Sequence, residues 1–177
     1  MSVGLFRMFR VPPLRSCGRQ HVGLPVLIAT VFGLTGPALA AKPSAEQGRY
    51  LAEVAGCNDC HTPGYMPRNG EVPESEWLTG ERFGWHGPWG TTYATNLRLT
   101  VQPFSEDAWV DYARRLRARP PMPWFGLNKM TDSDLRSLYR YLIALGPAGS
   151  PAPKALPPGV EPPPPYATFP GPPPAGD

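Results

Sequence analysis

The chain is poor in cysteine and histidine, with three of each among its 177 residues. One cysteine, Cys17, lies near the N-terminus, so only Cys57 and Cys60 remain in the body of the chain. A structural zinc site takes four cysteine or histidine ligands, and these two cysteines would need both His61 and His86 to reach that number. Because His61 directly follows Cys60, the two side chains are poorly placed to bind the same tetrahedral ion, and the sequence disfavours a zinc site.

The first 21 residues lack acidic side chains, and no apolar run near the N-terminus is long enough to span a bilayer comfortably. The basic residues here are Arg7, Arg10, Arg15 and Arg19. An apolar stretch, VGLPVLIATVFGLTG, follows and is broken by proline and glycine, and small residues at Ala38 and Ala40 then suit a signal peptidase. We therefore expect residues 1–40 to be a secretory signal peptide and the mature protein to be periplasmic. An uncleaved membrane anchor is the alternative.

An excess of positive charge is also missing once this signal is removed. The whole chain has a formal charge of +3, but four of its arginines belong to residues 1–40. Without them, 13 basic and 14 acidic side chains remain, which is a formal charge of −1. The mature sequence therefore gives no support to nucleic-acid binding.

Proline, in contrast, is abundant at the C-terminal end. Residues 147–177 contain 13 prolines in 31 positions. Proline lacks a backbone donor, so we expect this tail to form neither helix nor sheet but an extended polyproline-like chain, free or lying along the domain. A spacer or wrapping segment is favoured over a docking arm for a partner. We expect the tail to be dispensable for cofactor attachment.

Three helices are predicted from periodicity and capping residues. The first covers residues 44–57 with Ser44 as N-cap, the second 105–119 with Ser105 at its start, and the third 131–146 with Thr131 as N-cap. On the first helix, the expected apolar face consists of Tyr50, Leu51, Val54 and Ala55. On the third helix it consists of Leu135, Leu138, Tyr139, Leu142 and Leu145.

Residues 60–104, between the first two helices, show little periodicity. They contain six glycines, five prolines and three tryptophans. An irregular loop of this length is unusual in a compact domain unless it encloses something, and three modest helices bury little core by themselves. Both observations favour a large apolar guest, such as a haem.

The stretch AGCNDCHTPG, residues 55–64, contains the pattern C-x-x-C-H at Cys57, Cys60 and His61. In an exported protein this spacing is the attachment signature of c-type haem. Each thiol forms a thioether with one vinyl group, and the adjacent histidine reaches the iron. A thioredoxin-type disulfide is the other alternative, but the strand–helix–strand pattern that accompanies it is not found in the sequence. We therefore expect one covalent haem c.

The candidates for a sixth iron ligand are Met66, His86, Met122 and Met130. Met122, in the stretch RPPMPW, stands between two prolines in a loop between helices, and a rigid carrier reduces the entropy that a weak ligand loses on binding. Met66 lies too close to the C-x-x-C-H motif to reach the opposite face, and Met130 directly precedes a helix cap. His86 would give bis-histidine ligation and a lower potential. We predict Met122, with Met130, His86 and an open site as alternatives.

Three segments resemble those of the monohaem class I c-type cytochromes of bacteria, several of which serve periplasmic dehydrogenases. The segments are GRYLAEVAGCNDCHTPG, WLTGERFGWHGPWGTTYATNL and RPPMPWFGLNKMTDSDLRSLYRYLIALGP, and the resemblance covers about residues 44–146. It implies an all-α cytochrome c fold over residues 42–146, in which N- and C-terminal helices cross and loops enclose the haem. It also implies a close helix crossing between Gly48 and either Tyr139 or Tyr141.

The resemblance further implies Cys57 and Cys60 as the thioether sites and His61 and Met122 as the axial ligands. Iron with both axial positions filled does not bind a substrate, so we expect an electron carrier rather than an enzyme. Its partners would be a periplasmic dehydrogenase, an oxidase or another cytochrome. The alternatives are a fixed cytochrome subunit of a dehydrogenase complex, and a ligand-binding haem protein with an open iron.

Overall fold

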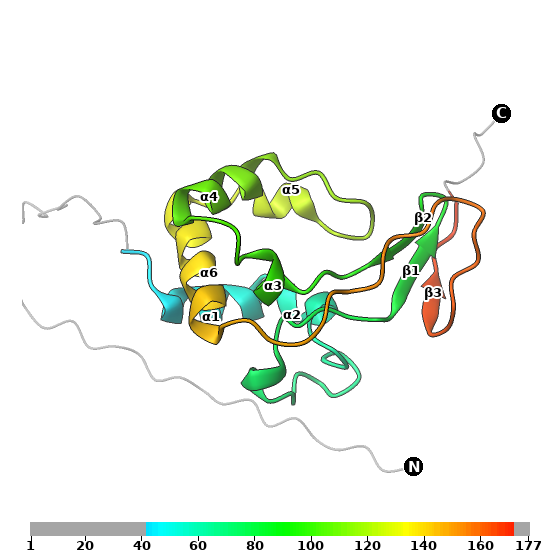
Figure 1. Cartoon of the computed structure of the whole chain (residues 1–177), viewed down its shortest axis with the longest axis horizontal. Helices are drawn as coiled ribbons and strands as arrows, with labels where there is room; N and C mark the ends of the chain where they lie inside the picture. Colours follow the sequence, from blue (N-terminus) through cyan, green and yellow to red (C-terminus); the bar gives the residue numbers. More distant parts are fainter. Residues whose placement is uncertain (1–41, 172–177) are drawn as a thin grey trace, which may run out of the picture. The chain divides into compact units, whose positions relative to one another are not determined.

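The computed structural model describes residues 42–171 (Figure 1). The predicted signal peptide, Cys17 and the last six residues of the tail lie outside the described residues. The elements, in chain order, are α1 (Ala45–Val54), α2 (Cys57–His61), η1 (Glu74–Glu76), β1 (Gly84–Gly87), β2 (Gly90–Tyr93), α3 (Leu97–Thr100), α4 (Glu106–Arg115), α5 (Trp124–Leu127), α6 (Asp132–Leu145) and β3 (Tyr166–Thr168). Among residues 42–171, no helix combines the length and the hydropathy that a membrane crossing requires.

The predicted helix starts are confirmed by their capping hydrogen bonds. The Ser44 hydroxyl accepts from the Gln47 amide at 3.0 Å, and the Ser105 hydroxyl accepts from the Ala108 amide at 3.3 Å. Thr131 forms a full capping box with Asp134 at the start of α6. These bonds satisfy amide groups that the first helical turn leaves without partners.

The second helix ends earlier than predicted, because α4 stops at Arg115 rather than at residue 119. Leu116 has already left the helical conformation, with φ −54° and ψ 133°. The side chain of Asn128 donates to the carbonyl of Ala113 at 2.5 Å and so provides the partner that another helical turn would have supplied. Residues 116–123 are thereby released to form the loop that carries Met122.

The predicted apolar face of the first helix is wrong at Tyr50 and Val54, although Leu51 packs against the core as expected. Tyr50 and Val54 are 56% and 60% exposed, whereas Gly48 and Ala52 are buried. The physical reason is a close crossing of α1 and α6, which places Gly48 of α1 against the backbone of α6 (Figure 1). A Cβ atom at Gly48 would lie 2.7 Å from the Cβ of Tyr141, so of the two tyrosines considered, Tyr141 is the one at the crossing.

Replacing Gly48 with alanine is expected to lower the free energy of unfolding by about 3 kcal/mol, at the upper end of the range for overpacking. The new methyl group would lie 2.0 Å from the carbonyl oxygen of Ser137, and backbone cannot rotate away as a side chain can. Urea unfolding of the purified protein measures the change. Tyr50→Ala on the same helix is the control and should cost less than about 0.5 kcal/mol, because Tyr50 is mostly exposed. Equal effects of the two changes would contradict the close crossing.

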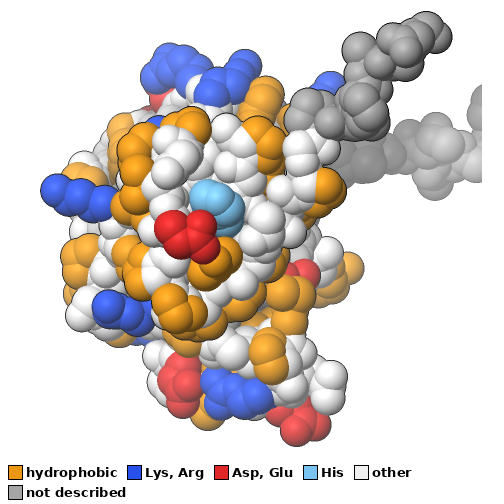
Figure 2. All heavy atoms as spheres, turned by 90° about the vertical axis from the view of Figure 1, so that its right-hand side faces the viewer, with side chains coloured by type: hydrophobic (Ala, Val, Ile, Leu, Met, Phe, Trp, Pro, Cys, Tyr) orange, Lys and Arg blue, Asp and Glu red, His pale blue; other side chains and the backbone are white. Residues whose placement is uncertain are grey.

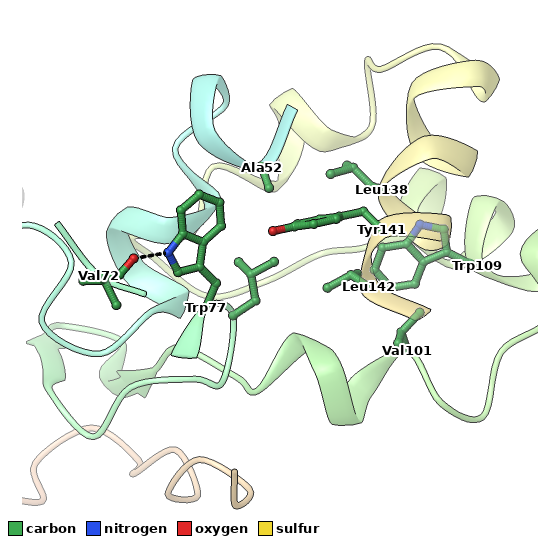
Figure 3. Packing of buried hydrophobic residues seen from close by; sticks show 9 residues of the cluster. Ala52, Val72, Trp77, Val101, Trp109, Leu138, Tyr141 and Leu142 are labelled. Carbon is green, nitrogen blue, oxygen red and sulfur yellow. Dashed lines mark hydrogen bonds between the residues drawn. The ribbon is translucent and has the colours of Figure 1, made fainter. Parts of the chain in front are cut away.

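The main core cluster packs α6 against α1, α4 and the segment that precedes β1 (Figure 3). Three members of the predicted α6 stripe, Leu135, Leu138 and Leu142, are buried, and Tyr139 and Leu145 pack against the core from its edge. Buried tryptophans complete the core with their indole groups satisfied: Trp77 donates to the carbonyl of Val72 at 2.8 Å, and Trp109 donates to the carbonyl of Leu135 at 3.0 Å.

A three-stranded sheet, in the order β2-β1-β3, accompanies the helices. β1 and β2 form an antiparallel hairpin within the segment that showed little periodicity, and β3 joins β1 in parallel. The prediction that the proline-rich tail forms no sheet is therefore wrong, since β3 belongs to it. Tyr166–Thr168 is the proline-free stretch between Pro165 and Pro170, and tyrosine and threonine favour strands.

Candidate functional site

A cavity of about 380 Å³ lies between the C-x-x-C-H segment, the β1–β2 hairpin, α4, α6 and the loop that joins α4 to α5. Most of its lining is apolar, with side chains such as Leu78, Trp109 and Leu142. All four site residues predicted from the sequence line it: Cys57, Cys60, His61 and Met122. The fold thus brings a loop residue more than 60 positions away in sequence to the same cavity as the motif.

Helix α2 holds the motif in one turn, with Cys57 and Cys60 three residues apart and His61 at its end. Gly56, with φ 70°, makes the left-handed step that separates α2 from α1 and that favours glycine. Inside the turn, the fully buried Asn58 accepts a hydrogen bond from the Thr62 hydroxyl at 2.8 Å. The same hydroxyl accepts from the Leu78 amide at 2.8 Å, so the turn is fixed to the segment behind it.

Both cysteines are free thiols whose surroundings disfavour ionisation. Burial raises the pKa of the Cys57 thiol to about 11. Burial, with a smaller contribution from the Asp59 carboxylate, also raises the pKa of Cys60. Zinc binding and disulfide exchange both use the thiolate. Residues 42–171 place no group of three or more Cys, His, Asp or Glu side chains together as a metal site. Neither the zinc site nor the redox disulfide considered above therefore gains support.

His61 is oriented by a backbone carbonyl. Its ring is 7% exposed, and Nδ1 lies 2.7 Å from the carbonyl oxygen of Thr95. A carbonyl only accepts, so Nδ1 carries the proton and Nε2 keeps the lone pair that a metal ligand needs. Burial lowers the pKa of His61, and the bond to Thr95 opposes this shift. The neutral ring with a free Nε2 is the form that binds iron.

Thr95 was missed as a functional residue because it acts through its backbone and lies 34 positions after His61. The segment around it is firmly held: the amide of Leu97 donates to the carbonyl of Leu78 at 3.0 Å. The buried Arg98 donates to carbonyls at the end of α6, including that of Gly146 at 2.6 Å. A cation at a helix C-terminus is stabilised by the helix dipole. In the sequence, Thr95 drew attention only as part of TTYATNL, the end of the second segment that resembles the c-type cytochromes.

The four candidates for a sixth ligand occupy different surroundings. Met122 and Met130 both line the cavity, whereas Met66 is 51% exposed and is not among the lining residues. His86 lies on β1, with Nδ1 2.8 Å from the Thr91 hydroxyl, and is also not among the lining residues. Met130 packs against both hydrophobic clusters of the core, and Met122 is a member of neither. Of the two methionines that line the cavity, Met122 is therefore the one whose side chain does not pack against the core clusters.

Two buried polar groups on the cavity wall have no hydrogen-bond partner. They are Nε1 of Trp85 and Oγ1 of Thr92, on residues that face each other across the β1–β2 hairpin. An unsatisfied buried polar group costs about 1–3 kcal/mol. This part of the wall therefore suits a ligand that is mostly apolar but also carries hydrogen-bonding groups. The periodicity of the sequence did not predict this pair of polar groups.

Comparison with known proteins gives one informative similarity. The chain is 33% identical, over 129 residues, to a protein named fructose dehydrogenase cytochrome subunit from Gluconobacter japonicus. The aligned part is 67% of this chain and 25% of the relative, so the chain spans about a quarter of the length of the curated relative that it matches. No family model and no solved structure matches. The similarity supports the general prediction that the chain is an electron-transfer cytochrome.

Proposed function

We propose that the protein is a periplasmic one-electron carrier with a single covalent haem c, built on a cytochrome c fold. The observation that carries the proposal is the placement of Cys57, Cys60 and His61 on one turn at the wall of an apolar cavity that Met122 also lines. The crossing of α1 and α6 at Gly48 supports the proposed fold. The predicted signal peptide supports export.

The residues present fit a haem. Cys57 and Cys60 would hold it through thioethers, Nε2 of His61 and Sδ of Met122 would bind its iron, and the apolar walls would cover its ring. The unpartnered groups of Trp85 and Thr92 suit the carboxylates that a haem carries. When bound, the group supplies reversible one-electron exchange between ferric and ferrous iron.

The chain's own residues then set the chemistry. His61 is held in its neutral form by burial and by Thr95, so its Nε2 is ready to bind without first losing a proton. A thioether ligand and an apolar wall both favour the ferrous state and raise the potential. If His61 and Met122 both held the iron, no open position would remain there for a substrate. The protein therefore transfers electrons and is not itself a catalyst.

A redox titration of the purified mature protein, together with carbon monoxide addition, tests this function. We expect a single transition that follows one electron, and no rapid binding of carbon monoxide by the reduced protein. Rapid binding would mean an open axial position, in favour of the alternative of a ligand-binding haem protein.

A fixed subunit of a dehydrogenase complex is the second candidate function, because the relative described above is named as a dehydrogenase subunit. The two candidates share the same haem site and differ in assembly. Purification of the untagged protein at native expression level separates them. A large subunit that remains bound through size exclusion supports the fixed subunit, and elution as the single chain supports the free carrier.

A further inference from the structure

The proline-rich tail touches two of the segments that form the cavity wall. After α6 it passes Asn96, whose side-chain amide donates to the carbonyls of Ala148 at 2.7 Å and Ser150 at 3.2 Å. Asn96 directly follows Thr95, the partner of His61. Asn96 is 3% exposed, and its Oδ1 also accepts from the amide of Leu99 at 3.0 Å, so the tail begins against a segment that is already well fixed.

The second contact is at Leu156. Its amide and carbonyl exchange two hydrogen bonds with Thr91 on β2, both at 3.0 Å. The approach is close: a Cβ atom on Gly90 would lie 2.2 Å from the Leu156 oxygen, and Gly90 has φ 93°, where glycine is favoured. The same carbonyl also accepts from Nη1 of Arg119 at 3.3 Å. Arg119 lies three residues before Met122.

The described part of the tail ends just after β3, an edge strand of the sheet. β3 pairs with β1, and the amide of Phe169 donates to the carbonyl of His86 at 2.7 Å. The Phe169 ring packs on Trp85, with ring centroids 5.8 Å apart, and on Trp89, at 5.6 Å. Figure 2 faces this end of the described chain and shows hydrophobic side chains spread over the visible surface, with most Lys and Arg side chains toward its edge. The tail is thus fixed at Asn96, Leu156 and Phe169.

We propose that residues 147–169 form a strap that positions the Met122 loop against the β1–β2 hairpin, with Arg119 as the positioning residue. The carbonyl of Leu156 joins the two parts, because it accepts one hydrogen bond from the Thr91 amide on β2 and another from the Arg119 side chain. The strap rests on the proposed function, since it acts on Met122 as an iron ligand. The expectation that the tail is dispensable for cofactor attachment stays a prediction: loosening the strap should leave the bonds from Cys57 and Cys60 to the haem in place and make Met122 leave the iron more often.

The test compares three single variants of the full-length protein. Arg119→Gln removes the contact with the Leu156 carbonyl. Leu156→Pro removes the amide that donates to Thr91 and leaves the net charge unchanged. Arg115→Gln is the control, because its side chain is 76% exposed, it pairs with Asp111 on the same helix, and it loses the same charge as Arg119→Gln. The readout is the rate at which the reduced protein binds carbon monoxide, which requires the methionine to leave.

We expect Arg119→Gln and Leu156→Pro each to raise this rate about fivefold, which corresponds to the loss of one net hydrogen bond, and Arg115→Gln to leave it unchanged. Covalent haem content should be the same in all proteins. Rates equal to the parent in both strap variants would overturn the strap and leave the haem site intact. A parent protein without covalent haem would instead overturn the proposed function. An equal rise in Arg115→Gln and Arg119→Gln, with none in Leu156→Pro, would show a charge effect and also overturn the strap.

Discussion

Met122→Ala should keep its covalent haem but lose the weak red absorption band of a sulfur–iron bond. The bonds proposed between the haem and the sulfurs of Cys57 and Cys60 would be untouched, so the haem should stay attached. Loss of the Met122 side chain removes the sulfur ligand that favours ferrous iron. The reduction potential should therefore fall by a fraction of the roughly 0.8 V that axial ligands span in haem proteins. The vacated position should bind carbon monoxide in the reduced state. Optical spectra and a redox titration measure all three effects.

Met130→Ala is the matched control, because Met130 lines the same cavity and packs against the core clusters. Because Met130 is partly buried, its truncation should lower the free energy of unfolding by about 2 kcal/mol, the lower end for buried methionines, and should leave the band and the potential nearly unchanged. If Met130→Ala removed the band and Met122→Ala kept it, the ligand would be Met130. The cytochrome proposal would then survive with a different sixth ligand.

Replacing both Cys57 and Cys60 with serine should abolish covalent attachment. The two thiols lie three residues apart on the single turn of α2, and a hydroxyl does not form the thioether. The mass of the intact mature chain should then equal that of the polypeptide alone, whereas the parent should be heavier by one haem. Because the haem is proposed to complete the core, the double variant should also accumulate poorly in the periplasm.

Cys17→Ser is the control for the double variant, since Cys17 belongs to the segment predicted to be removed on export. The mature mass and the haem content of this control should equal those of the parent. A single Cys60→Ser change should leave one thioether, and the mass should still include the haem. Attachment that persisted in the double variant would contradict the roles assigned to Cys57 and Cys60.

The sequence predicts those features of the fold and site that depend on neighbouring residues. The caps at Ser44, Ser105 and Thr131 were correct because each cap is an interaction within one helical turn. The placement of Cys57 and His61 on one turn follows in the same way from their spacing. Burial of Leu135, Leu138 and Leu142 also followed from spacing, since a period of 3.6 residues is local.

The features that could not be predicted depend on contacts between distant segments. The buried face of α1 is set by a backbone approach at Gly48, which hydrophobicity does not signal. The partner of His61 is a carbonyl, and any residue type supplies one. The strand at Tyr166–Thr168 forms because β1 offers a free edge to it, so the composition of the tail alone gave the wrong prediction.

Cys57 and Cys60 are proposed to attach one haem covalently, with His61 as an iron ligand, within the cavity that Met122 lines. The most direct measurement is the optical spectrum of the purified mature protein, oxidised and then reduced, before and after extraction with acidified acetone. We expect a haem spectrum that stays with the polypeptide after extraction, in the amount of one haem per chain, and a red sulfur–iron band in the oxidised native protein. A polypeptide that is colourless after extraction would contradict this proposal.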